Sequence, residues 1–404
     1  MRILFVAIGW SSHTARWINQ LDGLGWDIHL FPVHSADDGI HPELKNITLH
    51  DALHGRPRGA GESLRVVDDF WPSLKNGYPL RRGAMTARRL EKFFYPQRAD
   101  KIWRLAYTIK RLRPDIIHCL TIWESGEYVY KASRHLKERL PPWMVTAWGS
   151  DIYLFPRLAE RRESIKAVLS SCDYFTCDCE RDLKTARELG FKGEFLPVLP
   201  VAGGLETERL AAFRQPGRTS ARRLIMLKGY QDFAGRALVA LRAVELCAED
   251  LKGYCIAVYL ADQNVRIAAE IAAERSGLPI EIIPQSSPDD ILRLHGQARI
   301  SIGLSISDGL PLSVLEAMAM GSFPVQSNTS CSDEYLRDGE TCLLVPPEDP
   351  QAVADAIRRA LKDDALVDRA GEVNPRVIAE RLDYSVVQPK AVAMYEEVAR
   401  RARM

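Results

Sequence analysis

The stretch Ser305–Gly321 holds two carboxylates, Asp308 and Glu316, in a segment suited to binding an anion. The apolar run before it predicts a buried parallel strand, and a glycine after Asp308 predicts a turn. Pro311 marks the start of a helix, where its missing N–H costs nothing, and the closing glycine is typical of a helix end. Such a helix points free N–H groups and its positive dipole end at the turn. The segment predicts a phosphate site; the alternative is a capping Asp308 and a surface Glu316.

A second turn carries two cations at the carboxyl end of the expected strand Arg223–Leu227. Lys228 and Arg236 bracket the sequence KGYQDFAG, which contains two glycines. Two cations beside a glycine turn suit a diphosphate, because both can donate charge-assisted hydrogen bonds. The alternative is a pair of solvated surface charges.

In the N-terminal half, polar side chains follow two expected strands. His13 comes after the strand Arg2–Ile8, and Ser150 and Asp151 come after the strand Trp143–Trp148. Open α/β sheets bind ligands outside the carboxyl ends of their strands, so these side chains are candidates for a ligand site. The alternatives are a polar cap for His13 and a helix cap for the other two. No G-x-G-x-x-G motif accompanies them, so a dinucleotide site is not predicted.

Strands and helices alternate along the chain, which predicts parallel sheets with right-handed crossovers. Because 404 residues exceed one ordinary core, we expect two doubly wound Rossmann-like domains facing a central cleft. The expected domains are residues 1–200 and 201–384, joined through a proline- and glycine-rich linker at 197–218. The basic helix 385–404 is expected to pack back on the first domain. Residues 50–80 are expected to form a long irregular insertion.

The periodicity also predicts individual helices, among them residues 15–24, 124–140, 236–247, 350–362 and 385–401. No element is assigned between 362 and 385.

The composition indicates a water-soluble globular protein. Hydrophobic residues make up 46% of the chain and the formal net charge is +1, which gives no global attraction to nucleic acid. No apolar run approaches the ~20 residues of a membrane span. The start MRILFVAIGW enters a strand directly, so we expect no secretory signal and a cytoplasmic location.

One stretch, Arg81–Arg113, is strongly basic although the whole chain is nearly neutral. It holds eleven Lys and Arg residues against two acids, interleaved with aromatic side chains. We expect an acceptor or membrane surface, meeting an acidic glycan or anionic lipid at the inner face of the membrane. A solvated helical face is the alternative, and nucleic acid is a weaker third. The residues assigned to this surface are Arg81, Arg82, Arg88, Arg89, Lys92 and Trp103.

Several motifs occur in a fixed order: HxxR after the first strand, PDIIH, TAWGSD, the two-cation turn and DGLPLSVLEAMAMGSFPV followed by DGETCLLVPPEDP. Together they resemble the retaining nucleotide-sugar glycosyltransferases of the GT-B fold, the large family four also called glycosyl transferases group 1. The resemblance covers nearly the whole chain and is strongest over residues 298–360.

The resemblance implies roles for individual residues. Glu316 matches the second acid of the family's E-x7-E pattern, which holds the ribose hydroxyls of the donor. Asp308 matches the first acid of this pattern, which contacts the donor sugar. The family has glutamate at this position, and this chain has the shorter aspartate. The His that often precedes the GSD turn is Trp148 here, so the role of that His is not carried over. The implied donor-binding residues are Glu316, Lys228, Arg236, Gly309, Leu310, Leu312, Ser150 and Glu334, and the implied catalytic residues are Asp308, Asp151 and His13.

The implied reaction moves a sugar, with retention, from a UDP- or GDP-type nucleotide sugar to a glycan or lipid-linked acceptor, in polysaccharide or glycolipid synthesis. No metal and no cofactor is expected, because two side-chain cations can stabilise the leaving diphosphate. Two alternatives stay open: a nucleotide-sugar epimerase of the same architecture, and a non-catalytic protein that binds sugar nucleotides or glycans.

Overall fold

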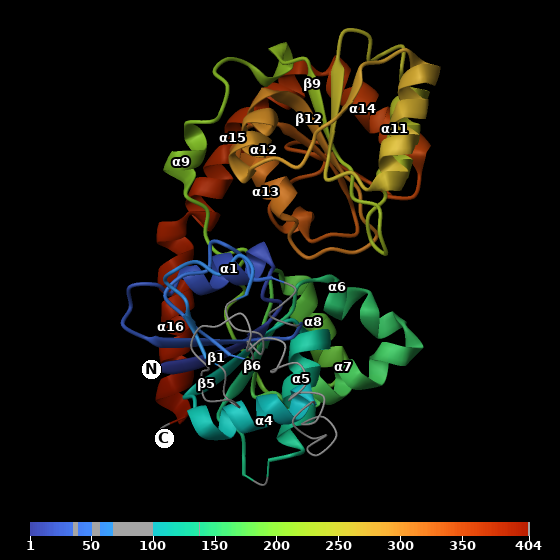
Figure 1. Ribbon diagram of the computed structural model, residues 1–404. Helices are drawn as coiled ribbons and strands as arrows, with labels where there is room; N and C mark the ends of the chain where they lie inside the picture. Colours follow the sequence, from blue (N-terminus) through green and yellow to red (C-terminus); the bar gives the residue numbers. More distant parts are fainter. Residues whose placement is uncertain (35–38, 51–56, 68–99, 137, 403–404) are drawn as a thin grey trace, which may run out of the picture. The chain divides into compact units, whose positions relative to one another are not determined.

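The computed structural model describes residues 1–34, 39–50, 57–67, 100–136 and 138–402. Its internal contacts divide the chain into two compact units (Figure 1). Unit 1 comprises Met1–Gly203 and Gln388–Met404, and unit 2 comprises Gly204–Val387. Each unit is built on one sheet whose strand pairs are all parallel within the described residues.

Unit 1 contains an eight-stranded sheet in the order β4-β3-β2-β1-β5-β6-β7-β8. The order reverses between β1 and β5, which defines a topological switch point. The short β4 lies within residues 50–80, which the sequence predicted to be irregular, and the short β3 ends just before them. The strands are β1 (Arg2–Ala7), β2 (Asp27–Pro32), β3 (Thr48–Leu49), β4 (Arg65–Val66), β5 (Ile116–Leu120), β6 (Trp143–Thr146), β7 (Tyr174–Thr176) and β8 (Glu194–Phe195).

Helices cover this sheet and bury its apolar residues. The central strands β1 and β5 are almost entirely buried, as parallel strands covered by helices require. The helices are α1 (Ser12–Asn19), α4 (Lys101–Leu112), the π-turn η2 (Ile122–Gly126), α5 (Glu127–Ser133), α6 (Ser150–Tyr153), the 3₁₀ turn η3 (Phe155–Arg157), α7 (Ala159–Ser171) and α8 (Glu180–Glu188). The helix expected over 124–140 is therefore shorter and begins as a π-turn.

Unit 2 contains a six-stranded sheet in the order β11-β10-β9-β12-β13-β14. This is the doubly wound Rossmann order, with its switch point between β9 and β12. The prediction of two Rossmann-like domains is confirmed. The strands are β9 (Leu224–Lys228), β10 (Cys255–Tyr259), β11 (Ile280–Ile282), β12 (Ala298–Gly303), β13 (Phe323–Ser327) and β14 (Leu343–Val345).

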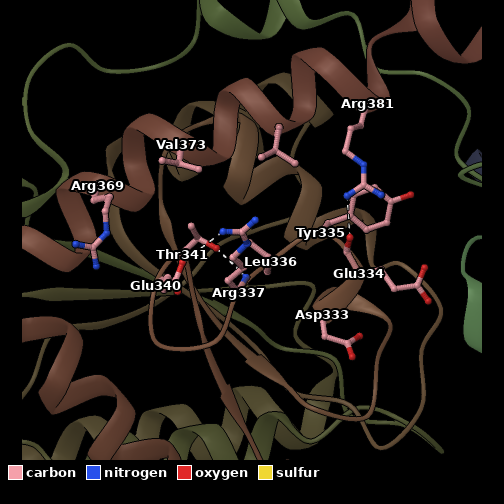
Figure 2. A pocket seen from close by; sticks show the side chains of 11 residues that line it. Asp333, Glu334, Tyr335, Leu336, Arg337, Glu340, Thr341, Arg369, Val373 and Arg381 are labelled. Carbon is pink, nitrogen blue, oxygen red and sulfur yellow. Dashed lines mark hydrogen bonds and ion pairs between the residues drawn. The ribbon is translucent and has the colours of Figure 1, made fainter.

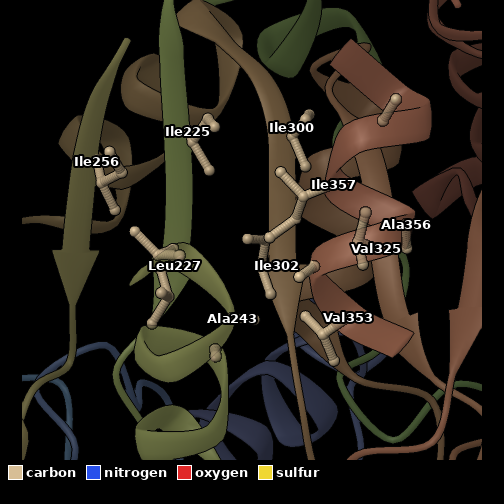
Figure 3. Close-up of a cluster of buried hydrophobic side chains, with 14 of the residues drawn as sticks. Ile225, Leu227, Ala243, Ile256, Ile300, Ile302, Val325, Val353, Ala356 and Ile357 are labelled. Atoms are coloured by element: carbon tan, nitrogen blue, oxygen red, sulfur yellow. The ribbon is translucent and has the colours of Figure 1, made fainter. Parts of the chain in front are cut away.

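The core of unit 2 lies between this sheet and the helices packed on it. The isoleucine and leucine side chains of β9, β10 and β12 belong to one buried cluster with Val353, Ala356 and Ile357 of α14, and Figure 3 shows Ile302 of β12 beside Ile357. The helices are α9 (Thr207–Ala211), the 3₁₀ turn η4 (Thr219–Ala221), α10 (Ala237–Leu246), α11 (Gln263–Ser276), α12 (Pro288–Gln297), α13 (Leu312–Ala319), the 3₁₀ turn η5 (Ser332–Glu334), α14 (Pro350–Lys362) and α15 (Asp364–Leu382).

Two of these helices correct the sequence prediction. The 19-residue α15 occupies a stretch to which no element was assigned, and α9 lies within the expected linker. By contrast, α14 has the predicted bounds, because Asp349 caps its first turn and Pro350 occupies its first position.

The last helix, α16 (Tyr384–Ala402), joins unit 1 through a buried hydrogen-bonded network. The hydroxyl of Tyr395 accepts a hydrogen bond from Trp17 Nε1 at 2.7 Å and lies 2.6 Å from Nδ1 of His118. The other ring nitrogen of His118 lies 2.6 Å from Thr146 Oγ1. Burial lowers the pKa of His118 to about 3, so this histidine stays neutral and structural.

Candidate functional site

The switch point of unit 2 brings together two loops, one after β9 and one after β12. They are fastened by backbone pairing between Gly235 and Ser305. The amide of Arg236 donates to the carbonyl of Leu304 at 3.0 Å, and the amide of Ile306 donates to a carbonyl of the first loop at 2.9 Å. The two segments singled out in the sequence therefore form one surface at the carboxyl ends of the central strands.

Hydroxyl groups fix the loop that follows β12. The amide of Ser305 donates to Ser327 Oγ at 3.2 Å, and Ser305 Oγ donates to the carbonyl of Ser307 at 2.6 Å. The hydroxyl of Thr329 donates to the carbonyl of Ser305. These hydrogen bonds define the conformation of the loop leading to α13.

Within the described part of the chain, no side chain caps the N-terminus of helix α13. Pro311 is the N-cap residue, and no side-chain hydrogen bond reaches the first turn. The amide of Val314 donates to the carbonyl of Pro311 at 3.0 Å. The amides of Leu312 and Ser313, the first two residues of the helix, have no acceptor within it, so an anion can bind them. The side chains of Leu310 and Leu312 pack in an apolar cluster, which leaves only their backbone for a ligand. The buried Gly309 is held in place by its carbonyl, which accepts a backbone hydrogen bond at 2.9 Å.

The two carboxylates of this segment each influence a tyrosine at the same edge of the sheet. Burial first, then Asp232 and the charge of Asp308, raise the pKa of Tyr230 to about 12. Burial and the charge of Glu316 raise the pKa of Tyr259, the last residue of β10. Both carboxylates therefore lie near the carboxyl ends of β9 and β10, in the same unit as the uncapped helix.

The two predicted cations differ in their surroundings. Lys228 ends β9, its ammonium lies 5.3 Å from the ring centre of Tyr230, and it has no carboxylate partner among the residues that the structure describes. The guanidinium of Arg236 instead donates to the carbonyls of Ala234 and Gly235 at 3.2 and 2.9 Å. It also pairs with Glu348 at 3.2 Å. Lys228 is thus the more available of the two cations for an anion.

Glu334 lies in the turn η5, which is in contact with Arg381 of α15. Arg381 donates to the carbonyl of Glu334 at 2.7 Å and stacks on Tyr335, 4.0 Å from the ring centre. Figure 2 shows these side chains beside a cavity of about 400 Å³. The cavity is lined by Asp333, Glu334, Tyr335, Leu336, Arg337, Glu340, Thr341, Arg369, Val373, Val377 and Arg381.

In unit 1, the loops after β1, β5 and β6 meet at the switch point of its sheet. His13, in the first turn of α1, contacts Trp148 with the ring centres 5.3 Å apart in a T-shaped arrangement. Ser150 is half-buried and begins α6, after Gly149, whose φ of 88° favours glycine. The structure therefore brings His13 close to the GSD turn.

Asp151 is buried and fastens two of these loops. Its carboxylate accepts hydrogen bonds from the amides of Ile122 and Trp148, both at 2.8 Å. Burial raises the pKa of Asp151 to about 7, although both hydrogen bonds oppose the shift. The geometry gives Asp151 an anchoring role, and its catalytic role stays a prediction.

Sequence reasoning missed three side chains near this edge. Trp10 is 53% exposed and stacks on His34, and His34 Nε2 lies 3.1 Å from a carboxylate oxygen of Glu124. No motif links them, because they are far apart in the sequence and follow three different strands. Trp10 follows β1, His34 follows β2, and Glu124 lies in the π-turn after β5. An exposed tryptophan in the loop after β1 was the one available signal.

The expected acceptor surface lies mostly outside the described residues. This applies to Arg81, Arg82, Arg88, Arg89 and Lys92. Trp103 is described; it lies in α4 and stacks on Tyr107 with ring centres 5.6 Å apart.

None of the helices that the structure describes is both long enough and apolar enough to cross a bilayer.

Two parallel Rossmann-like sheets, each with polar side chains at its switch point, define a protein of the GT-B class. The family model described as "Glycosyl transferases group 1" matches residues 253–376, and "Glycosyl transferase 4-like" matches residues 85–178. The chain belongs to the group 1, or family 4, glycosyltransferases. The family resemblance read from the sequence is thereby confirmed.

Two curated relatives are mannosyltransferases. A phosphatidyl-myo-inositol mannosyltransferase of Mycobacterium leprae is 38% identical over 86 residues, 21% of this chain and 23% of the relative. A GDP-mannose:cellobiosyl-diphosphopolyprenol alpha-mannosyltransferase of Komagataeibacter xylinus is 26% identical over 241 residues, 57% of this chain and 56% of the relative. The chain thus matches little more than half of the length of one relative and less than a quarter of the other.

Solved structures match nearly the whole chain at low identity. A sucrose-phosphate synthase of Thermosynechococcus elongatus has a TM-score of 0.70 at 15% identity and covers 98% of this chain and 99% of its own. The Anabaena protein HepE, in complex with UDP-glucose, has a TM-score of 0.69 at 12% identity and covers 98% and 100%. At these identities the likeness establishes the fold alone.

Proposed function

We propose that this protein transfers a sugar, with retention of configuration, from a nucleotide-sugar donor to a glycan or lipid-linked acceptor. The observation that carries the proposal is the uncapped N-terminus of α13 beside Lys228, Asp308 and Glu316, at the switch point of unit 2. Anions favour such a helix end, and nucleotide ligands favour such a switch point. The UDP-glucose bound to HepE and the GDP-mannose named for the Komagataeibacter enzyme support a donor of this class.

The donor site is proposed to act mainly through electrostatics. Breaking the sugar–phosphate bond develops negative charge on the diphosphate and positive character on the sugar. The first-turn amides of α13 and the ammonium of Lys228 stabilise the diphosphate, and Arg236 contributes if the donor displaces its pairing with Glu348. Glu316 holds the ribose hydroxyls, and Asp308 lies next to the donor sugar. The departing phosphate then guides the acceptor to the same face of the sugar.

Unit 1 is proposed to meet the acceptor. His13, Ser150 and Asp151 lie at the carboxyl ends of its central strands, where an acceptor can be held. The basic stretch around Trp103 is proposed to contact an acidic glycan or an anionic membrane surface, in the synthesis of a cell-surface polysaccharide or glycolipid. We propose a cytoplasmic protein that can associate peripherally with the inner leaflet.

The function is tested by incubating the full chain with a panel of UDP- and GDP-sugars. A glycosyltransferase slowly hydrolyses its own donor, which releases the nucleoside diphosphate and the free sugar. An epimerase would instead interconvert two nucleotide sugars, and a binding protein would leave the panel unchanged. We expect the wild-type chain to release UDP or GDP from one donor. We expect Lys228→Gln to lose this activity. Epimerisation, or no turnover of any donor, would contradict the proposal.

We also predict that donor hydrolysis needs no metal ion. The diphosphate charge is met here by helix amides and side-chain cations. Donor hydrolysis should therefore keep its rate after dialysis against EDTA and in its presence. Complete loss of hydrolysis in EDTA, restored by added Mg²⁺ or Mn²⁺, would refute metal independence. It would not contradict the proposal that the protein transfers a sugar.

A further inference from the structure

A second cavity of unit 2 lies at the opposite edge of the sheet from the donor loops. Arg222, which lines it, precedes β9, whereas Lys228 ends that strand. Six residues of extended chain span about 20 Å, so the two sites are well separated. The cavity has a volume of about 660 Å³, within the range of small-molecule sites. It is lined by Arg214, Gln215, Pro216, Gly217, Arg218, Thr219, Arg222, Asp368, Gly371, Glu372, Pro375, Arg376 and Ala379.

Four arginines line this cavity, and three of them have no acidic partner. Arg214, Arg218 and Arg376 make no ion pair with any residue that the structure describes, although surface arginines elsewhere in unit 2 pair widely. Arg214 and Arg218 come from the segment before β9, and Arg376 comes from α15. Cations with an unused guanidinium, converging from two elements, are suited to bind phosphate oxygens.

The fourth arginine, Arg222, is 7% exposed and is incompletely hydrogen-bonded. Its Nη1 donates to the carbonyls of Ala298 and Met320 at 3.1 and 3.2 Å, and its Nη2 donates to Gln215 at 3.2 Å. Its Nε has no acceptor. Burial first, and then the nearby Arg214, lower the pKa of Arg222 to about 10. A buried cation beside a second cation, with an N–H left over, is a position that an anion would stabilise.

Two acids line the cavity and offset only part of its positive charge, and the charge of Asp368 acts to raise the pKa of Arg222. Asp368 accepts hydrogen bonds from the amide and the hydroxyl of Ser220 at 2.8 and 2.9 Å, which occupies both of its oxygens. Glu372 is exposed and makes no ion pair within the described part of the chain. Four arginines against two acids leave a net positive cavity.

The cavity is also closely packed where α13 ends. Gly321 lies in the left-handed region at φ 69°, and a Cβ on it would come within 3.0 Å of the carbonyl of Gly371 in α15. Arg222 donates to the carbonyl of Met320, the C-cap residue of α13, which directly precedes that glycine. The arginine cluster is therefore built onto the end of the same helix whose beginning faces the donor loops.

We propose that this arginine-lined cavity binds a phosphorylated small molecule at a site separate from the donor site. The three arginines without acidic partners bind the phosphate oxygens, and the buried Arg222 adds its positive charge beside them. Because the ligand touches no donor residue, it is an effector rather than a substrate. Binding there would act on α13 through the Arg222–Met320 contact.

The test uses inorganic pyrophosphate as the probe and isothermal titration calorimetry on the full chain. All variants carry Lys228→Gln, which weakens pyrophosphate binding at the donor loops. Adding Arg218→Gln and Arg376→Gln should lower the remaining affinity at least about tenfold, since each lost arginine removes charge-assisted hydrogen bonds. Both side chains are exposed, so the fold should tolerate their replacement. Arg275→Gln, at an exposed position of α11 that lines neither cavity, is the matched control and should change nothing.

The two possible failures can be told apart. If the Lys228→Gln protein binds no pyrophosphate, or if the two arginine substitutions leave its affinity unchanged, the effector site is refuted. Donor hydrolysis by the wild-type chain is measured separately, so it can succeed or fail independently of this result. Circular dichroism of each variant confirms that a lost affinity does not reflect unfolding.

Discussion

Single residues at turns and helix ends were the most predictable part of the site. Pro311 and Gly321 mark the two ends of α13 as the sequence indicated, because their backbone preferences do not depend on distant contacts. The surroundings of Arg236 were not predictable. Its partner Glu348 lies 112 residues away, and only the fold brings the two together. The anchoring hydrogen bonds of Asp151 were missed for the same reason.

The raised pKa of Asp151 leads to a prediction about stability. Its carboxyl titrates at about 7 when folded and near 3.8 when unfolded, so the folded state holds its proton more tightly. The stability that this group contributes is complete below pH 4 and is lost as the pH rises toward 7. Relative to Asp151→Asn, the wild-type protein should lose free energy of unfolding across that window, by at most ~1.4 kcal/mol per pH unit.

Urea denaturation of both proteins at several pH values between 4 and 8 measures this difference. Only the change with pH matters, because the asparagine also alters the hydrogen bonds to Ile122 and Trp148. A wild-type advantage that grows with rising pH would show that the carboxylate is held in its charged form.

At the scale of elements, helices with clear end signals were found and one without them was missed. Helix α14 has a capping aspartate and a proline at its first position. Helix α15 contains Gly371 and Pro375, which usually end a helix. Proline at 375 removes the hydrogen bond to the carbonyl of residue 371, yet tertiary packing on α13 maintains the helix. Such packing cannot be read from the sequence.

The loop after β9 gives a prediction at this scale. A Cβ on Gly235 would lie 2.1 Å from the carbonyl of Tyr230, so any side chain must displace the turn. Gly235 also pairs with Ser305 of the other donor loop. We expect Gly235→Ala to lower the free energy of unfolding by ~1–3 kcal/mol and to abolish donor hydrolysis.

Thermal denaturation and the donor-hydrolysis assay measure these two effects. Gly61→Ala is the control, because its Cβ would come no nearer than 3.8 Å to the carbonyl of Pro42. Wild-type hydrolysis in Gly235→Ala would mean that the paired loops do not form the donor site.

At the scale of the whole molecule, the architecture could be predicted from the sequence. Of the chemistry, only the class of reaction could be predicted. Regular strand–helix alternation in both halves predicted two Rossmann-like sheets, because parallel strands need crossover connections. The short strands β3 and β4 were missed, since two-residue strands carry no periodic signal. No motif in the sequence specifies the donor sugar or the acceptor of the proposed reaction.

The central claim is that unit 2 binds a nucleotide sugar through Glu316. Isothermal titration calorimetry of the full chain with the donor identified by the hydrolysis panel tests it most directly. Glu316→Ala should weaken donor binding by ~2–3 kcal/mol, about 30- to 150-fold, by removing charged hydrogen bonds to the ribose. Glu274→Ala, at an exposed position of α11, should leave the affinity unchanged. Equal donor affinity in wild type and Glu316→Ala would contradict the account.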